Sequence, residues 1–329
     1  MPTSVLDKRE VIGLRFARRA DWDRNPRPHG MVTATAVGPD RNLYAFGGAA
    51  PGRGVPASVT VYSPDGGVLR TWGEGEFDSG RAHGITIVGD ESVYLVEDVG
   101  CRVRRFDLDG TELAVIGPSG EDCRSDTGVD WDVRDAHARL RMMRPDGAGP
   151  FNRPTALAVG ANGLLYVSDG YGNCKVHCFA ADGAYVTSWG RSGQGPAEFR
   201  LPHGITADGD HLLVCDREND RIQVFGLDGA YLTEWTGLHR PENVAIGPDG
   251  HYYIAEGYER AGYVSFAHGP NDRPRPSRVS IRDADGTELG HVEVGFRLHH
   301  VAVDSDGNLY CCPSTAEADS RIVRFVRVG

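Results

Sequence analysis

LPHGITADGDHLLVCD, residues 201–216, is the stretch that decides the fold. It reads as an alternating apolar strand, a turn at Gly209-Asp210 and a second apolar strand. Short strands joined by Gly/Asp turns are typical of antiparallel sheets. The same pattern recurs in RAHGITIVGDESVYLVED (81–98), RPTALAVGANGLLYVSD (153–169), RPENVAIGPDGHYYIAE (240–256), RLHHVAVDSDGNLYCCP (297–313) and a degenerate first copy from Val32.

Most units continue with a third strand, such as Arg221 to Phe225, a D-G turn and a fourth strand, such as YLTEWT (231–236). Asp-Gly between alternating strands is a strong hairpin signal. Four short antiparallel strands in six successive units predict an all-β fold, a six-bladed β-propeller that forms a single domain over residues 1–329. The last unit ends after its third strand, so we expect Glu10 to Phe16 to close the ring as its fourth strand.

Two insertions interrupt the repeat. The charged segment 118–150 contains Trp131, Met142 and Met143, and we expect part of it to pack down as a lid. The second insertion, HGPNDRPRPSR (268–278), lies inside the fifth unit. Long loops in compact domains are usually functional or disordered. We expect almost no helix outside the first insertion.

Composition narrows the function classes. The net charge of −11 argues against a surface for nucleic-acid phosphates, and no run approaches the roughly 18 apolar residues of a membrane span. The N-terminal MPTSVLDKREVIGLRF lacks the apolar core of a signal peptide. We therefore expect a cytoplasmic protein that binds neither nucleic acid nor membrane, with its seven cysteines as buried thiols. Composition leaves the oligomeric state open.

Three histidines share one position in the repeat. Counting back from the turn gives His83, His203 and His299 in units two, four and six, while the same slot holds Thr33, Thr155 and Asn243 in units one, three and five. Alternate blades of a six-fold ring are related by a third of a turn, and first strands line the channel, so the imidazoles should converge. Three neutral imidazoles with an open position are a common catalytic zinc site. Alternatively, each is a satisfied polar residue at a strand start, and His300 competes with His299 as ligand.

The motifs YVSDGYGN (166–173) and FRLPHGITADGDHLLVCDRENDRIQVF (199–225), with the histidine repeats, resemble peptidyl-α-hydroxyglycine α-amidating lyase, a propeller family of the NHL-repeat class. Members bind zinc through three histidines and cleave an N-acyl hemiaminal to an amide and an aldehyde. The resemblance implies zinc, or another divalent transition metal, on His83, His203 and His299. It also implies a catalytic tyrosine at Tyr171 and a functional arginine at Arg217.

These residue types suit that chemistry. A metal-bound hydroxyl is more acidic than a free one, and Tyr171 would take its proton as general base. Arg217 would supply positive charge near the tyrosine or grip a substrate carboxylate. Alternatively, Tyr171 packs between blades, and Arg217 forms an ion pair with Asp216, Glu218 or Asp220.

Two departures from the family's pattern shape the expected substrate. The place of the family's first-blade arginine reads AFGGAAPGRG (45–54), with only Arg53 nearby, and His300 stands where the family has an acidic residue implicated in a structural calcium site. A structural Ca²⁺ is therefore left open. We expect a bacterial lyase acting on a small-molecule N-acyl hemiaminal or α-hydroxy amide. The alternatives are a non-catalytic NHL-type propeller that binds a protein partner and a lactonase-like metal-dependent hydrolase.

Overall fold

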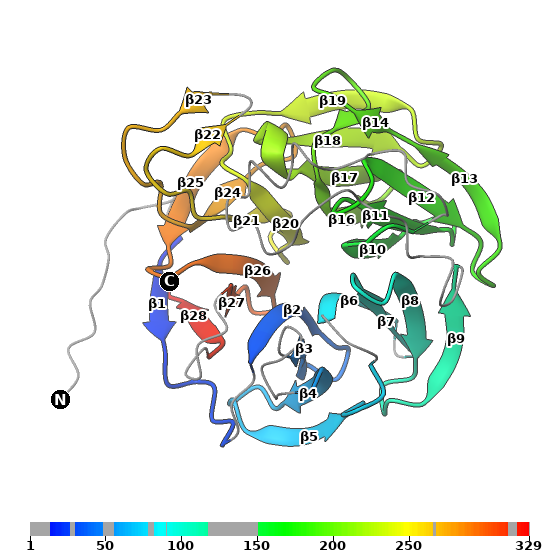
Figure 1. The fold of residues 1–329 in the computed structure, drawn as a ribbon. Coiled ribbons are helices and arrows are strands. Elements are labelled where there is room, and N and C mark those ends of the chain that lie inside the picture. The colour runs from blue at the N-terminus through cyan, green and yellow to red at the C-terminus, as the bar shows by residue number, and fades with distance from the viewer. Residues whose placement is uncertain are drawn as a thin grey trace.

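Six four-stranded antiparallel sheets surround a central channel in the computed structural model (Figure 1). The structure describes residues 14–26, 30–48, 56–77, 82–89, 91–117, 151–265, 268–314 and 321–328. The prediction of an all-β, six-bladed propeller is confirmed. Within the described ranges, the helical element is one 3₁₀ turn, η2 (Arg217–Asn219). The lid expected at 118–150 lies outside the described residues.

The first three blades follow the chain from the channel outward. Their strands are β2 (Met31–Val37), β3 (Leu43–Gly48), β4 (Ser58–Tyr62) and β5 (Val68–Trp72); β6 (Ala82–Val88), β7 (Ser92–Glu97), β8 (Arg102–Phe106) and β9 (Glu112–Ile116); β10 (Ala156–Val159), β11 (Leu165–Asp169), β12 (Lys175–Phe179) and β13 (Tyr185–Trp189). Each inner strand is joined to its neighbour by a tight turn, as the repeat predicts.

The last three blades complete the ring. Their strands are β16 (Pro202–Asp208), β17 (His211–Asp216), β18 (Arg221–Gly226) and β19 (Tyr231–Trp235); β20 (Pro241–Ile246), β21 (Tyr252–Glu256), β24 (Arg278–Arg282) and β25 (Glu288–Glu293); β26 (Leu298–Val303), β27 (Leu309–Pro313), β28 (Val323–Arg327) and β1 (Phe16–Arg19). Two minor ribbons pair β14 (Arg191–Ser192) with β15 (Glu198–Phe199) and β22 (Val264–Ser265) with β23 (Gly269–Pro270).

The N-terminal strand closes the sixth blade, but later in the chain than expected. β1 pairs with β28 from Phe16 opposite Arg327 to Arg19 opposite Arg324, whereas the prediction placed this strand at Glu10 to Phe16. The difference arises because the outermost strand of a blade is half exposed, so its side chains do not form the apolar run that the prediction sought. Pairing the outer edge in this way removes the open strand that a truncated blade would leave.

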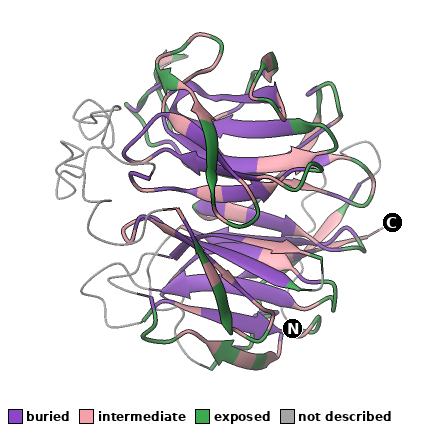
Figure 2. Ribbon diagram, turned by 90° about the vertical axis from the view of Figure 1, so that its right-hand side faces the viewer, coloured by how far each residue is buried: buried purple, intermediate pink, exposed green. Residues whose placement is uncertain are grey.

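Apolar side chains fill the space between neighbouring blades, and Figure 2 shows the inner strands buried. Between blades one and two, Phe77 packs against Phe46 and Phe106 with ring centroids 5.1 and 6.0 Å apart. The D-G turns also lock blades together. A Cβ on Gly286, at φ +79°, would lie 2.2 Å from Trp235, the last residue of β19 in the preceding blade, so only glycine fits there.

The second insertion belongs to the described part and lies on blade five. β23 pairs with β22, and Glu259 bridges to Arg275. Tyr263 and Ser265, on the stretch just before the insertion, donate hydrogen bonds to Glu218 and Asp220 beside η2. The β22–β23 ribbon that joins this stretch to the insertion therefore lies against the loop that carries Arg217.

Two further expectations concern the described residues alone. Six of the seven cysteines lie in the described ranges, and each is a buried free thiol. The helices in those ranges include none with the length and apolar character needed to cross a membrane.

Candidate metal centre

In five of the six inner strands, β2, β6, β16, β20 and β26, a bulge near the start of the strand takes a side chain out of the ladder. In β6, Ala82 pairs with Glu97 and Gly84 with Val96, which leaves His83 outside the ladder. His299 is passed over in the same way in β26. Bulges re-aim a side chain while the ladder continues on both sides. This repeated irregularity explains why a histidine stands at the start of a buried strand.

The structure brings His83, His203 and His299 together on the axis. Their ring centroids lie 4.8, 5.1 and 5.2 Å apart, and their potential ligand atoms all lie within 4.8 Å of one another. All three side chains are buried, with 3%, 3% and 7% exposure. Burial, followed by Arg217 and the other two imidazoles, holds the pKa of His203 well below its usual range. His203 is therefore neutral at physiological pH.

Backbone carbonyls of the next blade orient each imidazole. The Nδ1 atoms of His83, His203 and His299 lie 2.6, 2.8 and 2.7 Å from the carbonyl oxygens of Thr155, Glu242 and Thr33. A carbonyl only accepts, so each Nδ1 carries a proton, and in the neutral ring Nε2 is then the nitrogen with the free lone pair. Such bonds orient the ring and raise its basicity as a ligand. Three neutral imidazoles presenting Nε2 fit zinc or a similar divalent transition metal.

The slot in blade five holds Glu242 rather than Asn243, and this corrects the sequence alignment. Pro241 pairs with Glu256 and Asn243 with Ala255, so Glu242 occupies the bulge. The count from the turn was one residue off in this blade: the hairpin loops of blades five and six, 247–251 and 304–308, are equally long and place Glu242 level with His299. Asn243 instead bonds the backbone of Val301 across the blade interface.

Tyr171 lies directly against the histidine cluster. Its hydroxyl oxygen is 3.1 Å from Nε2 of His83 and 3.2 Å from Nε2 of His203. Tyr171 follows Asp169-Gly170 at the end of β11, and a Cβ on Gly170 would lie 2.0 Å from the carbonyl oxygen of Pro202. Glycine at this position therefore lets the chain pass close to blade four and deliver the phenol to the axis.

Arg217 stands beside this tyrosine. The guanidinium carbon lies 5.6 Å from the centre of the Tyr171 ring, within the range of a cation–π contact. Nε donates to Glu218 at 2.9 Å, and Nη1 donates to Glu242 at 3.2 Å. Of the three ion-pair partners that sequence reasoning considered, Glu218 is the one in contact. Glu242, 25 positions away, was missed.

Glu218 is shared by several donors. Arg240 donates to it at 2.9 Å, and the Tyr263 hydroxyl also donates to it. Burial alone would raise the pKa of Glu218, but Arg240 and Arg217 lower it to about 2. The carboxylate of Glu218 is therefore ionised. It holds Arg217 through Nε, whereas Glu242 holds it through Nη1.

Blade five carries a second tyrosine at the position of Tyr171. Tyr258 comes two residues after Glu256, which ends β21, as Tyr171 comes two residues after Asp169. The guanidinium of Arg297 lies 4.7 Å from the Tyr258 ring centre. The repeat thus has a tyrosine at equivalent chain positions of blades three and five, and sequence reasoning singled out only Tyr171.

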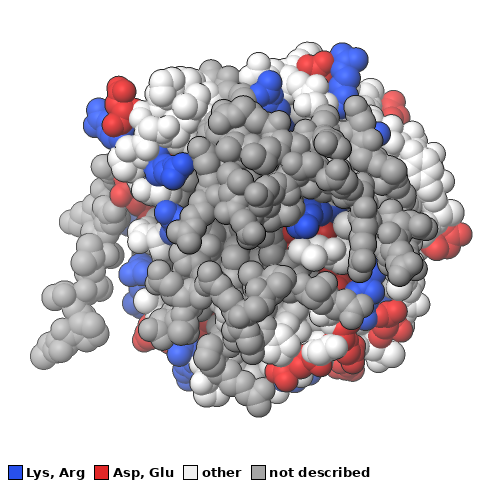
Figure 3. Space-filling view, in the orientation of Figure 1, with Lys and Arg blue, Asp and Glu red and all other residues white. Residues whose placement is uncertain are grey.

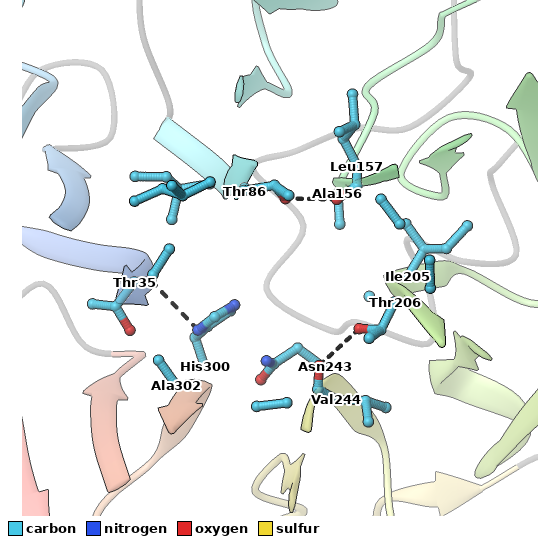
Figure 4. Close-up of a pocket in the computed structure, with 18 of the residues that line it drawn as sticks. Thr35, Thr86, Ala156, Leu157, Ile205, Thr206, Asn243, Val244, His300 and Ala302 are labelled. Atoms are coloured by element: carbon cyan, nitrogen blue, oxygen red, sulfur yellow. Dashed lines mark hydrogen bonds between the residues drawn. The ribbon is translucent and has the colours of Figure 1, made fainter. Parts of the chain in front are cut away.

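The channel beside the triad encloses about 600 Å³ and is lined mostly by apolar side chains (Figure 4). Hydrogen bonds tie neighbouring blades around it. The Thr86 hydroxyl donates to the Leu157 carbonyl at 2.6 Å, and the Thr206 hydroxyl donates to the Val244 carbonyl at 2.7 Å. The backbone N–H of Thr35 donates to Nδ1 of His300 at 3.4 Å.

His300 does not join the ligand cluster, and its surroundings do not fit calcium. Burial and His299 lower its pKa to about 3, so the imidazole is neutral. Ca²⁺ takes six to eight oxygen ligands that usually include carboxylates. Among the described channel-lining residues Glu242 carries the carboxylate, and it is paired with Arg217. A structural calcium at His300 is thus not supported by the residues present.

The face of the propeller that is turned to the viewer in Figure 1 is only partly described. Figure 3 shows basic and acidic side chains interspersed over its described surface. Arg53, the residue nearest the place of the family's first-blade arginine, lies outside the described residues, as do Trp131, Met142 and Met143 of the insertion.

Comparisons with known proteins agree with this architecture. A family model described as a 6-bladed beta-propeller matches residues 157–262. Peptidylglycine alpha-amidating monooxygenase of Rattus norvegicus is 40% identical over 90 residues, covering 25% of this chain and 9% of that protein. NHL repeat-containing protein 3 of Homo sapiens is 28% identical over 249 residues, covering 71% of this chain and 64% of that protein. A probable peptidyl-alpha-hydroxyglycine alpha-amidating lyase of Caenorhabditis elegans is 28% identical, covering 50% and 42%.

Solved structures share the fold at low sequence identity. A streptogramin B lyase superposes with a TM-score of 0.61 at 11% identity, covering 96% of this chain and 98% of that one. A gluconolactonase from Xanthomonas campestris superposes with a TM-score of 0.58 at 16% identity, covering 96% and 90%. The chain spans less than two thirds of the length of these curated relatives. Over parts of its length it is similar to amidating lyases and to NHL repeat proteins, at 28–40% identity.

Proposed function

We propose that this protein is a zinc-dependent lyase that cleaves the carbon–nitrogen bond of a small N-acyl hemiaminal or α-hydroxy amide. The observation that carries this proposal is the convergence of three imidazoles and one phenol. His83, His203 and His299 would hold the metal through Nε2, and the Tyr171 hydroxyl lies 3.1 and 3.2 Å from two of those nitrogens. The distant amidating-lyase relatives support the same reaction class.

When bound, a zinc ion at the three imidazoles would act as a Lewis acid that makes the hemiaminal hydroxyl easier to deprotonate. The carbonyls of Thr155, Glu242 and Thr33 keep Nε2 of each ring oriented toward the axis. All three rings are buried, which keeps them fixed as ligands. The chain therefore supplies a fixed ligand set beside a channel of about 600 Å³.

Tyr171 acts as the general base in this proposal. It accepts the proton of the substrate hydroxyl, the carbonyl forms, and the carbon–nitrogen bond breaks with its electron pair going to nitrogen. The nitrogen then takes a proton from Tyr171. One hemiaminal gives one amide and one aldehyde, with no water consumed and no change of oxidation state. Arg217 places a cation 5.6 Å from the centre of the Tyr171 ring, where it can contact the bound substrate.

The nature of the ligands favours a lyase over a lactonase-like hydrolase. The axial donors here are three imidazoles, a nitrogen donor set that suits zinc rather than an oxygen-seeking cation. Glu242, on the same ring of positions, pairs with Arg217, and Asn243 bonds Val301. Neither side chain is arranged with the histidines as an oxygen ligand.

A substrate screen with reconstituted protein tests this function. Metal-free protein and protein loaded with one equivalent of zinc are each given N-(hydroxymethyl)benzamide, N-benzoyl-α-hydroxyglycine and a γ-lactone. The expected result is zinc-dependent formation of benzamide and the matching aldehyde in equal amounts. Equal rates with and without metal would contradict the proposal. Hydrolysis of the lactone alone would favour the hydrolase, and zinc binding without any turnover would favour the non-catalytic alternative.

A further inference from the structure

We propose that Glu242 is a positioning residue that holds Arg217 against Tyr171 and offsets the positive charge of the metal centre. It occupies, on blade five, the bulge position that carries the histidines on blades two, four and six. This inference rests on the proposed function for its kinetic consequences, although the contact between Glu242 and Arg217 is part of the structure itself.

Glu242 contacts two parts of the site at once. Its carbonyl oxygen accepts the Nδ1 proton of His203 at 2.8 Å. Its carboxylate oxygen Oε2 lies 3.2 Å from Nη1 of Arg217 and 3.4 Å from Nδ1 of His203. The backbone contact persists whatever side chain is present, whereas the carboxylate contact depends on the side chain. The two roles can therefore be separated by substitution.

The two buried guanidinium charges beside Tyr171 are balanced by two carboxylates only when Glu242 is included. Arg217 and Arg240 are both in contact with Glu218, and Arg217 is only 8% exposed. Without Glu242, two guanidinium groups would share one carboxylate in a buried setting. Leaving a buried charge without full compensation is strongly unfavourable. Glu242 supplies the second negative charge.

A metal ion would make that compensation more important. Arg217 is held near Tyr171, whose hydroxyl touches His83 and His203, so a dication on the histidines would repel the guanidinium. Glu242 attracts Arg217 through Nη1, while Glu218 attracts it through Nε. The pair of carboxylates thus fixes the guanidinium between two anchors beside the tyrosine ring.

Gly257 leaves room for this carboxylate. A Cβ at Gly257 would lie 2.5 Å from Oε1 of Glu242. Gly257→Ala would therefore displace the carboxylate without changing any charge, which provides a second way to disturb the contact.

The kinetic test is a double-mutant cycle of Glu242→Gln with Arg217→Met. Glu242→Gln is expected to retain zinc and the fold and to lower kcat by about 10- to 100-fold, as typical for partners that orient metal-site residues. In the Arg217→Met background it should cause no further loss, because its effect passes through Arg217. It should also raise the melting temperature of Arg217→Met, since Glu242 is then an unpaired buried charge. Gly257→Ala should lower kcat in the same direction as Glu242→Gln.

The matched control is Glu234→Gln. Glu234 forms an ion pair with Arg221 at 2.8 Å, and both residues belong to blade four. The Glu234 side chain is 34% exposed and lies on the outermost strand, β19, away from the histidines. This variant should keep wild-type kcat. Losses of kcat that multiply in the double variant, or wild-type kcat in Glu242→Gln, would overturn the positioning role.

A second readout does not need turnover. In protein labelled with ¹⁵N-arginine, Glu242→Gln should accelerate hydrogen exchange of the Arg217 guanidinium at least tenfold, because Nη1 loses its charged partner. The Arg240 guanidinium, bonded to Glu218, is the internal reference and should keep its rate. Unchanged exchange at Arg217 would overturn the inference even if no substrate were found. Accelerated exchange in a protein without lyase activity would instead contradict the proposed function alone.

Discussion

The hydroxyl oxygen of Tyr171 lies 3.1 Å from the Nε2 atom of His83, although the residues are 88 positions apart. Two backbone features create this contact. A bulge turns His83 out of its ladder, and Gly170 lets the chain after β11 pass against Pro202. The proposed base and one proposed metal ligand are therefore held together by the geometry of neighbouring blades.

Tyr171→Phe should retain the fold and the metal and lose turnover by about 100-fold or more, because the general base is removed. The measurement is kcat with N-(hydroxymethyl)benzamide, alongside zinc content and the unfolding midpoint.

Tyr258→Phe is the matched control for that experiment. It removes a phenol at the equivalent position of blade five, where the ring contacts Arg297. It should keep wild-type kcat to within a few-fold. Wild-type turnover by Tyr171→Phe would eliminate the base assignment and leave the metal as the catalytic group.

Replacing one of His83, His203 or His299 with alanine should lower metal occupancy severely, because two imidazoles make a weak site. Equilibrium dialysis against zinc measures this. His211→Ala and His251→Ala serve as controls, since these side chains lie at hairpins away from the cluster and should leave occupancy unchanged. Full occupancy in the double variant of His83 and His203 would remove the site from consideration.

Deleting residues 1–19 should destabilise the protein and promote aggregation, because it removes β1 and exposes the edge of β28. Deleting residues 1–13 leaves β1 and the buried Leu14 in place and should be tolerated. Urea unfolding and light scattering compare the two. Equal stability of both deletions would show that β1 does not close the ring in solution.

Gly286→Ala should cost about 1–3 kcal/mol of unfolding free energy, because the new methyl group would overlap Trp235. Gly250→Ala separates strain from overlap. Gly250 has a similar φ of +74°, but no atom lies within 4 Å of the position of its Cβ, so it should lose only the conformational part. The order of the two losses, measured by denaturant unfolding, tests the packing of turn against tryptophan.

Asp220 should make stability rise as the pH falls from 7 to 5. Burial raises its pKa to about 6 from an ordinary value of 3.8, while Ser265 opposes the shift. Between those values the folded protein binds a proton that the unfolded chain releases, so acidification favours folding, by about 1 kcal/mol at pH 5 relative to pH 7.

Asp220→Asn removes that contribution and preserves the left-handed backbone at φ 54°, which asparagine tolerates. The unfolding free energy of the wild type, relative to that of the variant, should therefore be higher at pH 5 than at pH 7. An unchanged difference at the two pH values would show that Asp220 does not bind a proton in the folded state over this range.

Local patterning accounts for most of the fold. Alternating apolar residues and D-G turns identified the strands, because hairpins depend on short-range chemistry. The closing strand was misplaced because Arg18 and Arg19 are exposed on an outer strand, where the pattern is indistinguishable from a loop. The hydrogen bond from Tyr263 to Glu218 spans 45 positions and left no local pattern in the sequence.

The repeat in the sequence predicted the three histidines of the site but not the residues around them. His83, His203 and His299 were singled out because their alternation on blades implies convergence. Glu242 was missed because the count from the turn was one residue off in blade five, and the ladder register shows that Glu242 shares the position of His299. The environment of Arg217 depends on Glu242 in another blade, which no local motif encodes.

X-ray absorption at the zinc edge of untagged, zinc-loaded protein tests the central claim most directly. The account predicts a first shell of three imidazole nitrogens at about 2.0–2.1 Å with one further light ligand. That shell should lose one imidazole in His203→Ala. A first shell dominated by carboxylate oxygens or by sulfur, or one unaltered in His203→Ala, would contradict a metal centre built by His83, His203 and His299.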